Sequence, residues 1–316
     1  MTRHDLTPTG TAAPDAATIS LVGLTTEEAD PRYAEIDRMS VGNLAVLMND
    51  ADATVPGAVA LALPSIVPAI EAAALRMKAG GRLIYVGAGT PGRIGVLDAS
   101  ECPPTFSTPP EQVFAIIAGG LKAIVSPCEG AEDDPAAGVS AIDAAGVTSL
   151  DTVIGIASSG RTPYVVAAVA RARELGALSI GLSCNRGTVL SEAAEHGIEV
   201  LVGPEVLSGS TRLKAGTAQK LVLNMFSTIV MVQLGKTYGN LMVDVKPTNV
   251  KLRERALGIV RTVAGVSRDR AEAALATSGY NVKVAIVLLR TGRSTEEAGA
   301  RLSAVNGNLR AALEEQ

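Results

Sequence analysis

The sequence has little of what several classes of binding protein require. Tryptophan is absent, aromatic residues make up 3% of the 316 residues, and the formal net charge is −4. Without stacking platforms or an excess of cations, the protein is not expected to bind nucleic acid. There are two histidines, and the three cysteines lie far apart with no Cys-x-x-Cys pair. We therefore predict no metal site and a reducing, cytoplasmic compartment.

Signals for a membrane segment or a targeting segment are also weak. The longest uncharged run, residues 53–70, just reaches the length of a membrane span, but it contains three prolines and a glycine. We expect two buried helix pieces there, and no membrane partner. Residues 1–23 are rich in Thr, Ala and Pro and lack an apolar stretch with basic flanks. They are expected to form a disordered tail and not a signal peptide.

What the chain does contain is a regular series of β-rich runs. Hydrophobic residues make up 47% of the sequence, enough to build a substantial core. Five short runs alternate with helical stretches, which predicts a parallel sheet covered by helices on both faces. The runs are residues 82–87, 113–117, 152–158, 178–183 and 198–203. A long, mostly apolar helix is expected at 211–234, buried in the domain or in a subunit interface.

The C-terminal part is different in kind, because no strand signal follows Lys246-Pro247. Residues 267–286 resemble residues 294–313, and each copy is expected to form two short helices joined by a Gly/Asn turn. Ser294 and Glu297 have the spacing of a capping box. We predict a ligand-binding α/β domain at 24–246 and a helical domain at 247–316.

The stretch GAGTPG, residues 87–92, follows the first β-rich run and matches G-x-G-x-x-G. A dinucleotide site also needs an acidic residue at the end of the second strand, and here that strand ends VFAIIAGG, without one. A turn that needs glycine only for its backbone is a second interpretation. The third is an anion or sugar site at the carboxyl edge of the sheet, where such folds bind ligands.

A second loop, SSGRTP at residues 158–163, favours this third interpretation. It places Ser158, Ser159 and Thr162 around Gly160, followed by Pro163 at a plausible first helical position. Hydroxyls, amides and a helix N-terminus directed at one point would suit a phosphate monoester. Simple N-capping is the alternative, but it needs one hydroxyl and not three.

Two glutamates are candidates for acid and base chemistry. Glu101 in DASECPP lies just before Pro103-Pro104, where a helix is expected to stop, so its carboxylate should lie at a helix end near the ligand edge. Glu132 in EGAEDD lies in a predicted loop. Two carboxylates at one sugar could divide the acid and base roles. The alternative for the second motif is a solvated acidic loop that favours the start of the next helix.

The segment 203–220 gathers small residues and cations at a loop and helix start. Such a set would suit a phosphorylated ligand, although a basic helix face near a subunit contact has the same composition. The candidate ligands in it are Glu205, Ser208, Ser210 and Lys214.

Taken together, these motifs resemble those of a known family. GAGTPGRIGVLDASECPPTF, EGAEDDP, SSGRTPY, GPEVLSGSTRLKAGTAQK and MVDVKPTNVKLRERA are similar to the N-acetylmuramic acid 6-phosphate etherases. Those enzymes belong to the sugar isomerase (SIS) superfamily and are similar to the glucokinase regulatory proteins. The resemblance extends from about residue 24 to the C-terminus.

The resemblance implies an α/β, SIS-type three-layer sandwich with a five-stranded parallel sheet, plus a small all-helical, UBA-like C-terminal domain. It implies a cytoplasmic lyase without cofactor or metal that removes D-lactate from N-acetylmuramic acid 6-phosphate. Glu101 would be the acid and Glu132 the base, and Gly89 and Thr90 would join the residues of 158–162 in binding the sugar phosphate. It also implies a homodimer whose active site both subunits complete.

In one respect the sequence departs from the family pattern. The first loop usually reads G-T-S-G-R-L-G, whereas this chain has Pro91 and Ile94. Either Thr90 and the amides of the turn compensate for the lost hydroxyl, or substrate binding is altered. A non-catalytic sugar-phosphate-binding regulator and a dinucleotide-dependent dehydrogenase are the competing functions.

Overall fold

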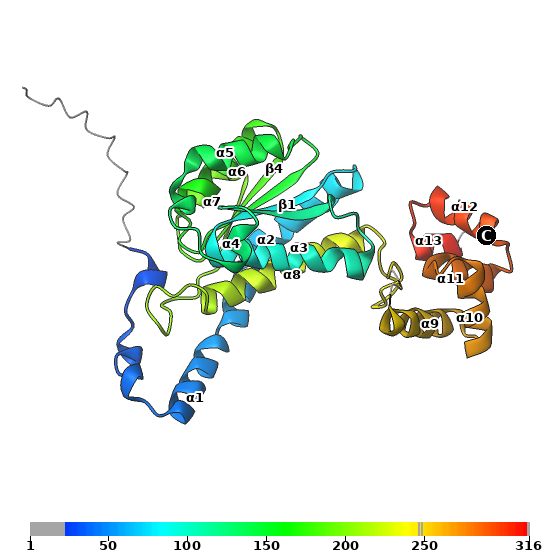
Figure 1. Ribbon diagram of the computed structural model, residues 1–316, viewed down its shortest axis with the longest axis horizontal. Helices are drawn as coiled ribbons and strands as arrows, with labels where there is room; N and C mark the ends of the chain where they lie inside the picture. The colour runs from blue at the N-terminus through cyan, green and yellow to red at the C-terminus, as the bar shows by residue number, and fades with distance from the viewer. Residues whose placement is uncertain (1–22, 246, 248, 315–316) are drawn as a thin grey trace, which may run out of the picture.

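The computed structural model describes residues 23–245, 247 and 249–314. The tail predicted at residues 1–23 therefore lies almost wholly outside the described residues. The α/β unit contains five strands, and Figure 1 shows helices on both faces of the sheet they form. The strands are β1 Leu83–Gly87, β2 Val113–Ile117, β3 Thr152–Ile156, β4 Leu178–Ser183 and β5 His196–Glu199.

The sheet is parallel throughout and has the order β2-β1-β3-β4-β5. Every residue of β1, β3 and β4 is buried, which explains why their sequences are hydrophobic without alternation. The chain moves outward from β1 in both directions, to β2 on one side and β3 on the other. A crevice is expected at the carboxyl ends of β1 and β3 for this reason.

Two layers of helices enclose the sheet, which confirms the predicted three-layer architecture. Alternate side chains of one strand face opposite layers, so Tyr85 packs in one hydrophobic cluster and Ile84 in the other. The Tyr85 side contains α2 Val55–Lys78, α3 Gly89–Phe106 and α8 Lys214–Gln233. The Ile84 side contains α5 Pro135–Ala144, α6 Pro163–Glu174 and α7 Val189–Ala193. The remaining N-terminal and connecting elements are η1 Thr25–Glu27, η2 Pro31–Tyr33, η3 Ile36–Arg38, α1 Val41–Asp52, α4 Lys122–Val125 and η4 Ala131–Asp133.

The apolar run 53–70 does not form two helix pieces as predicted, because α2 is one helix that continues through Pro64 and Pro68. Both prolines lie on the exposed face. Pro64 has no N–H to donate to the carbonyl of Ala60, and Ala60 is exposed as well. Water can reach these carbonyls, so the prolines cost less there than on the buried face. The stretch Val41–Lys78 is long and apolar enough to cross a membrane by length and composition, but in this fold α2 packs on the sheet and on α8.

Two further boundaries differ from the prediction. The fifth strand was expected at 198–203 but is β5, His196–Glu199. Val200 still donates its N–H to Ser183 O at 2.9 Å, and it is buried with Val202 in the chain leading to α8. Helix α3 does not stop before Pro103 but ends at Phe106, because Ser107 adopts a left-handed conformation and closes the last turn onto Pro103 O. Glu101 is thus within the helix.

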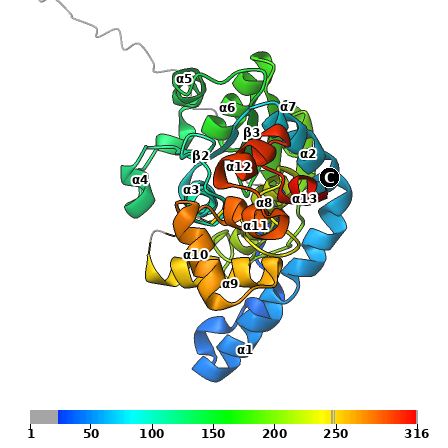
Figure 2. The ribbon, with the colours of Figure 1, turned by 90° about the vertical axis from the view of Figure 1, so that its right-hand side faces the viewer.

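The C-terminal repeats form two helix pairs, as predicted, and the Ser294–Glu297 capping box is present. Figure 1 shows these helices as a cluster apart from the sheet, and in the view of Figure 2 they lie in front of the α/β unit. Its hydrophobic core already includes Val243 and Val245, a few residues before the predicted boundary at 247. The helices are α9 Val250–Ala264, α10 Arg268–Thr277, α11 Val282–Thr291, α12 Thr295–Ala304 and α13 Leu309–Glu314.

A buried lysine joins this cluster to the α/β unit. Lys283 Nζ donates to Gly235 O at 3.0 Å, to Asp244 Oδ2 at 2.6 Å and to Gly307 O at 2.6 Å. The three acceptors come from the end of α8, the connecting segment and the second repeat. Three acceptors satisfy the three donors of an ammonium group, so its charge is compensated although the side chain is buried.

Candidate active site

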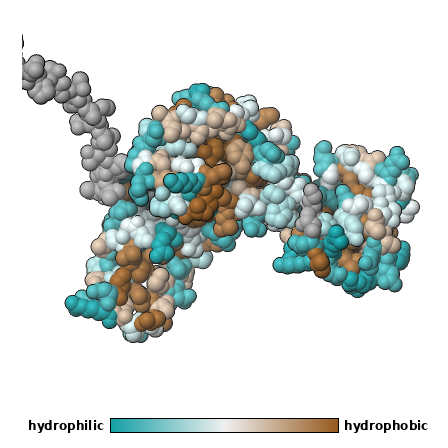
Figure 3. All heavy atoms as spheres, in the orientation of Figure 1, coloured by the Kyte–Doolittle hydropathy of each residue, from teal (hydrophilic) through white to brown (hydrophobic). Residues whose placement is uncertain are grey.

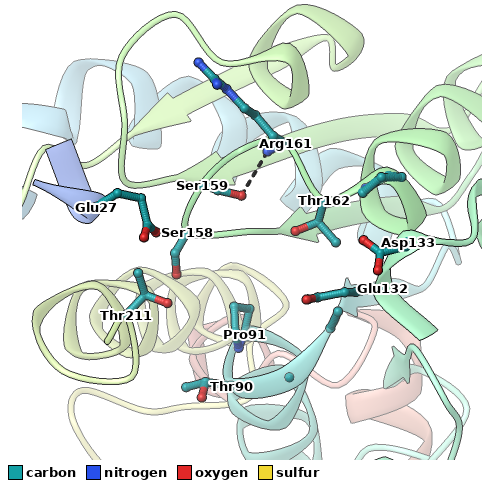
Figure 4. Close-up of a pocket in the computed structure, with 13 residues that line it drawn as sticks. Glu27, Thr90, Pro91, Glu132, Asp133, Ser158, Ser159, Arg161, Thr162 and Thr211 are labelled. Carbon is teal, nitrogen blue, oxygen red and sulfur yellow. Dashed lines mark hydrogen bonds between the residues drawn. The ribbon is translucent and has the colours of Figure 1, made fainter. Parts of the chain in front are cut away.

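A cavity of about 280 Å³ opens at the carboxyl ends of β1 and β3. This is the point where the strand order reverses, and the one to which the sequence interpretation assigned a ligand. The loops after β1 and β3 line it from two sides, and η1 and η4 complete its wall (Figure 4). The lining residues are Glu27, Ala88, Gly89, Thr90, Pro91, Glu132, Asp133, Ser158, Ser159, Arg161, Thr162, Pro163 and Thr211.

The glycines of GAGTPG make the turn from β1 into α3 possible. A Cβ on Gly87 would lie 2.6 Å from the backbone nitrogen of Gly92, and Gly89 has a φ of +55°. The preceding residue, Ala88, provides no side-chain cap for α3. The first amides of this helix therefore remain available at the cavity, where an anion would be favoured. The second strand ends at Ile117 and Ala118 follows it, so no acidic side chain is there to hold a dinucleotide ribose.

Two buried side chains hold the loop after β3 in place. Gln219 Nε2 donates to Ser158 Oγ at 2.9 Å, and Asn185 Nδ2 donates to Ser158 O at 2.9 Å. Gly160 has a φ of +66°, and a Cβ there would lie 2.3 Å from Thr188 Cβ, so only glycine fits. Helix α6 begins at Pro163 after Thr162, which provides no side-chain cap. A second helix N-terminus is thus left uncapped at the same cavity.

Glu132 enters this cavity from η4 (Figure 4). Its side chain is reachable from solvent, but the surrounding protein reduces its hydration, and this raises the pKa of the Glu132 carboxyl. The negative charges of Asp133 and Glu129 raise that pKa further. A carboxylate with a raised pKa is a stronger base, which suits proton abstraction. Asp134, the next acidic residue, accepts the N–H of Ala137 and caps α5, as the alternative interpretation expected.

Of the other sequence candidates, Gly89, Thr90, Ser158, Ser159 and Thr162 line the cavity. Gly160 lies in the same loop, but it packs against Thr188 and does not line the cavity. The candidates of segment 203–220 are placed differently, since none of the four lines the cavity.

Glu205 and Lys214 are buried and hold the start of α8. The Glu205 carboxylate accepts the backbone N–H groups of Lys214 and Ala215, both at 2.9 Å, and Lys214 Nζ donates to Val202 O at 2.7 Å. This cap explains why α8 begins at Lys214 and not at the predicted residue 211. Ser208 donates its hydroxyl to Glu27 O, and Ser210 does not line the cavity.

Glu101 is also outside the cavity of its own chain. It follows Gly89 by twelve residues in α3, and a rise of about 1.5 Å per residue places it about 18 Å along the helix axis from the cavity. Its side chain is exposed. The expectation that Glu101 lies at a helix end beside the ligand edge of the sheet is therefore wrong for the single chain.

The cavity also contains residues that the sequence interpretation did not select, chief among them Glu27, with Asp133, Arg161 and Thr211. Arg161 and Thr211 lie inside quoted motifs, so a closer look at those loops could have found them. Glu27 comes from a segment far ahead of the first strand, and its spacing gives no signal that it returns to the sheet. Among the described residues no cluster of three His, Cys, Asp or Glu side chains has the arrangement of a metal site.

The fold and the cavity define an α/β protein of the SIS class, and two family models agree. The SIS domain model matches residues 136–229, and the model of the glucokinase regulatory protein N-terminal SIS domain matches residues 65–173. The C-terminal lid domain of glucokinase regulatory protein matches residues 239–287. A phosphoheptose isomerase from Francisella tularensis has a TM-score of 0.49 at 20% identity, over 61% of this chain and 100% of its own.

Curated relatives are far more similar in sequence. One from Streptomyces coelicolor is 58% identical, covering 92% of this chain and 93% of its own length, and one from Rubrobacter xylanophilus is 57% identical, covering 92% and 96%. Both bear the name N-acetylmuramic acid 6-phosphate etherase. The chain belongs to the N-acetylmuramic acid 6-phosphate etherase family.

Proposed function

We propose that the protein is a lyase that cleaves the D-lactyl ether of N-acetylmuramic acid 6-phosphate to give N-acetylglucosamine 6-phosphate and D-lactate, in the recycling of cell-wall sugars. The observation that carries this proposal is Glu132, a carboxylate with a raised pKa in a cavity with two uncapped helix N-termini. Such a cavity offers a base for the sugar and amides for its phosphate. The name shared by relatives of 58% and 57% identity supports the assignment.

The phosphate would bind at the loop of residues 158–162. The Ser159 and Thr162 side chains line the cavity beside the start of α6, so their hydroxyls can donate to phosphate oxygens that the positive end of the helix dipole also favours. The turn after β1 contributes Thr90 and the first amides of α3. Pro91, in the place of the family's serine, is buried in the wall and has neither an N–H nor a hydroxyl to offer.

The chemistry begins with opening of the sugar ring to its aldehyde, which acidifies the proton on carbon 2. Glu132 takes this proton, and the electron pair of the broken C–H bond is held in an enolate shared by carbon 1, carbon 2 and the aldehyde oxygen. That pair then forms the double bond between carbons 2 and 3 as the carbon 3 to oxygen bond breaks. The electron pair of the broken C–O bond leaves with lactate, whose oxygen receives a proton from an acid. Water finally adds to the double bond, with hydroxide to carbon 3 and a proton to carbon 2. No electron is gained or lost overall.

The acid for the departing lactate oxygen is, in our proposal, Glu101 of a second copy of the chain. Within one chain this carboxylate is about 18 Å from the cavity along α3, so it reaches a substrate only across a subunit interface. Leu97, one turn earlier on the same helix face, is an apolar side chain that is 53% exposed. Exposed apolar surface of this kind is typical of a contact between subunits, and Figure 3 shows such surface on the α/β unit.

We also propose that the protein acts in the cytoplasm. Cys102, Cys128 and Cys184 are free thiols, which fits a reducing compartment. A phosphorylated sugar as substrate fits the same location.

The direct test is to incubate the purified protein with N-acetylmuramic acid 6-phosphate and measure D-lactate. We expect release of one lactate for each N-acetylglucosamine 6-phosphate formed. If the protein binds the sugar phosphate but releases no lactate, the result would instead favour a non-catalytic regulator. The matches to glucokinase regulatory protein domains are the observation behind this second possibility.

Replacing Ser159 and Thr162 together by alanine should weaken substrate binding with the fold intact. Each hydroxyl lost from a charged phosphate removes about 1.5–3 kcal/mol. The measurement is the ratio of affinities for phosphorylated and unphosphorylated N-acetylglucosamine, which should fall. Thr277→Ala is the matched control, because Thr277 bonds only within its own helix in the C-terminal unit. An unchanged ratio in the double variant would show that the phosphate binds elsewhere.

The pH dependence should report the raised pKa of Glu132. Only the ionised carboxylate can take the carbon 2 proton, so kcat/KM should fall as the pH drops through this pKa, at a higher pH than an ordinary glutamate (about 4.3) would give. Removing a neighbouring negative charge with Asp133→Asn should shift the acid limb to lower pH. Asp269→Asn, in the C-terminal unit, should leave it in place. If Asp133→Asn leaves the acid side of the kcat/KM profile at the same pH, Glu132 is not the titrating base.

A further inference from the structure

We propose that Glu27 is a substrate-positioning residue that accepts hydrogen bonds from the hydroxyl or acetamide groups of the sugar. The N-terminal strap, residues 24–28, includes η1 and brings this carboxylate into the cavity wall. In Figure 4, Glu27 points toward Ser158 and Thr211 from the side opposite Glu132. The inference rests on the proposed function, because it concerns the same cavity and the same sugar phosphate.

The strap is fixed in place by buried contacts. Leu24 is 2% exposed and Thr26 is fully buried. Thr26 O accepts the N–H of Gly209 at 3.2 Å, and Glu27 O accepts the hydroxyl of Ser208 at 2.9 Å. Fixing residues on both sides of a side chain lowers the entropy lost when it binds a ligand. Glu27 is thus held at the cavity before any ligand arrives.

A single amide joins the strap to the predicted phosphate loop. Asn185 Nδ2 donates to Thr26 Oγ1 at 3.0 Å and to Ser158 O at 2.9 Å. Asn185 Oδ1 accepts the hydroxyl of Thr25 at 3.0 Å. Since Asn185 is 1% exposed, this network is shielded from water and geometrically specific. The positions of Glu27 and of the loop of residues 158–162 are therefore set by the same side chain.

The Glu27 carboxylate itself is left available. It is half-buried, and it forms no hydrogen bond or ion pair with any residue in the described part of the chain. Gly209 leaves room for it, since a Cβ there would lie 2.8 Å from Glu27 Oε2. Holding a half-buried carboxylate without protein donors costs free energy. A ligand that supplies donors would recover that cost.

The chemistry of a carboxylate determines which part of the ligand it binds. An ionised carboxylate only accepts hydrogen bonds, and it repels a phosphate at close range. The phosphate is therefore bound by the amides and hydroxyls of the loops, and Glu27 faces the donor groups of the sugar. Held at both ends, the sugar presents carbon 2 toward Glu132 on the other side of the cavity. Glu27 transfers no proton in this account.

The test compares Glu27→Gln with Glu28→Gln, the adjacent glutamate, which is exposed and does not line the cavity. Glu27→Gln should raise the KM for N-acetylmuramic acid 6-phosphate and the Kd for N-acetylglucosamine 6-phosphate by about 10–100-fold, with a much smaller change in kcat. Its affinity for inorganic phosphate should be unchanged or higher, because a negative charge has been removed. Glu28→Gln should behave like the unchanged protein.

Two results would overturn the proposal. One is a KM and a Kd in Glu27→Gln within twofold of the unchanged protein. The other is a parallel loss of affinity for inorganic phosphate, which would show that Glu27 only supports the loops. Lactate release by the unchanged protein tests the proposed function separately. If it were absent, the affinities for N-acetylglucosamine 6-phosphate and for phosphate would still decide on Glu27.

Discussion

Glu132→Gln should abolish both lactate release and exchange of the carbon 2 proton with deuterated water. Glutamine cannot accept the proton, so the electron pair needed for elimination never becomes available. General base catalysis typically contributes about 10²–10⁴-fold, and both rates should fall by that order. Glu129→Gln is the matched control: Glu129 belongs to the same acidic loop but does not line the cavity, so this variant should retain most of the activity.

Glu101→Gln should give a different pattern, because the acid acts after the base. Without a proton for the departing oxygen, lactate release should fall by about 10²–10⁴-fold. Glu132 can still remove the carbon 2 proton and return deuterium, so exchange should persist. The reverse pattern would exchange the two roles and leave the lyase assignment in place. Near-normal lactate release by both variants would contradict the two-carboxylate mechanism.

Mixing the two inactive variants should restore activity if Glu101 and Glu132 of one site come from different subunits. In a hybrid dimer of Glu101→Gln and Glu132→Gln, one site contains both substitutions and the other contains both native glutamates. Random pairing makes half of the dimers hybrids, so about a quarter of the native activity should return. Each variant taken alone through the same exchange procedure is the control, and it should stay inactive.

The outcome that contradicts a shared site is equally clear. Two different affinity tags identify the hybrid dimers. If these hybrids form but release no lactate, both carboxylates of a site belong to one subunit. A monomer with full activity at micromolar concentration, measured by light scattering, would remove the dimer from the account altogether.

The α/β fold was largely predictable because its signals are local. Strands buried on both faces must be hydrophobic without alternation, and the runs at β1, β2 and β4 were found nearly to the residue. Helix α2 was not predictable in this way, because propensity alone makes Pro64 and Pro68 helix breakers. Whether they break it depends on which face they occupy, and that is fixed by the packing of α2 on the sheet.

The part of the site that is formed by the loops after β1 and β3 was predictable from the sequence. Parallel strands carry their following loops to one edge, so Thr90, Ser159 and Thr162 meet at the cavity as expected. The role implied for Glu101 does not give its distance from the cavity, which follows from the unbroken run of α3 between Gly89 and Glu101. Glu27 is held at the cavity by the contact of Thr26 with Asn185 and by its own contact with Ser208, partners over 150 residues away in the chain. No local pattern encodes such contacts.

The central claim is that the ether bond is cleaved by elimination and water addition. It is tested most directly by running the reaction in deuterated, ¹⁸O-labelled water and analysing both products by mass spectrometry. The account predicts deuterium on carbon 2 and ¹⁸O in the carbon 3 hydroxyl of N-acetylglucosamine 6-phosphate, with unlabelled oxygen in the lactate hydroxyl. Label in the lactate hydroxyl, or a sugar that keeps its original hydrogen on carbon 2, would contradict it.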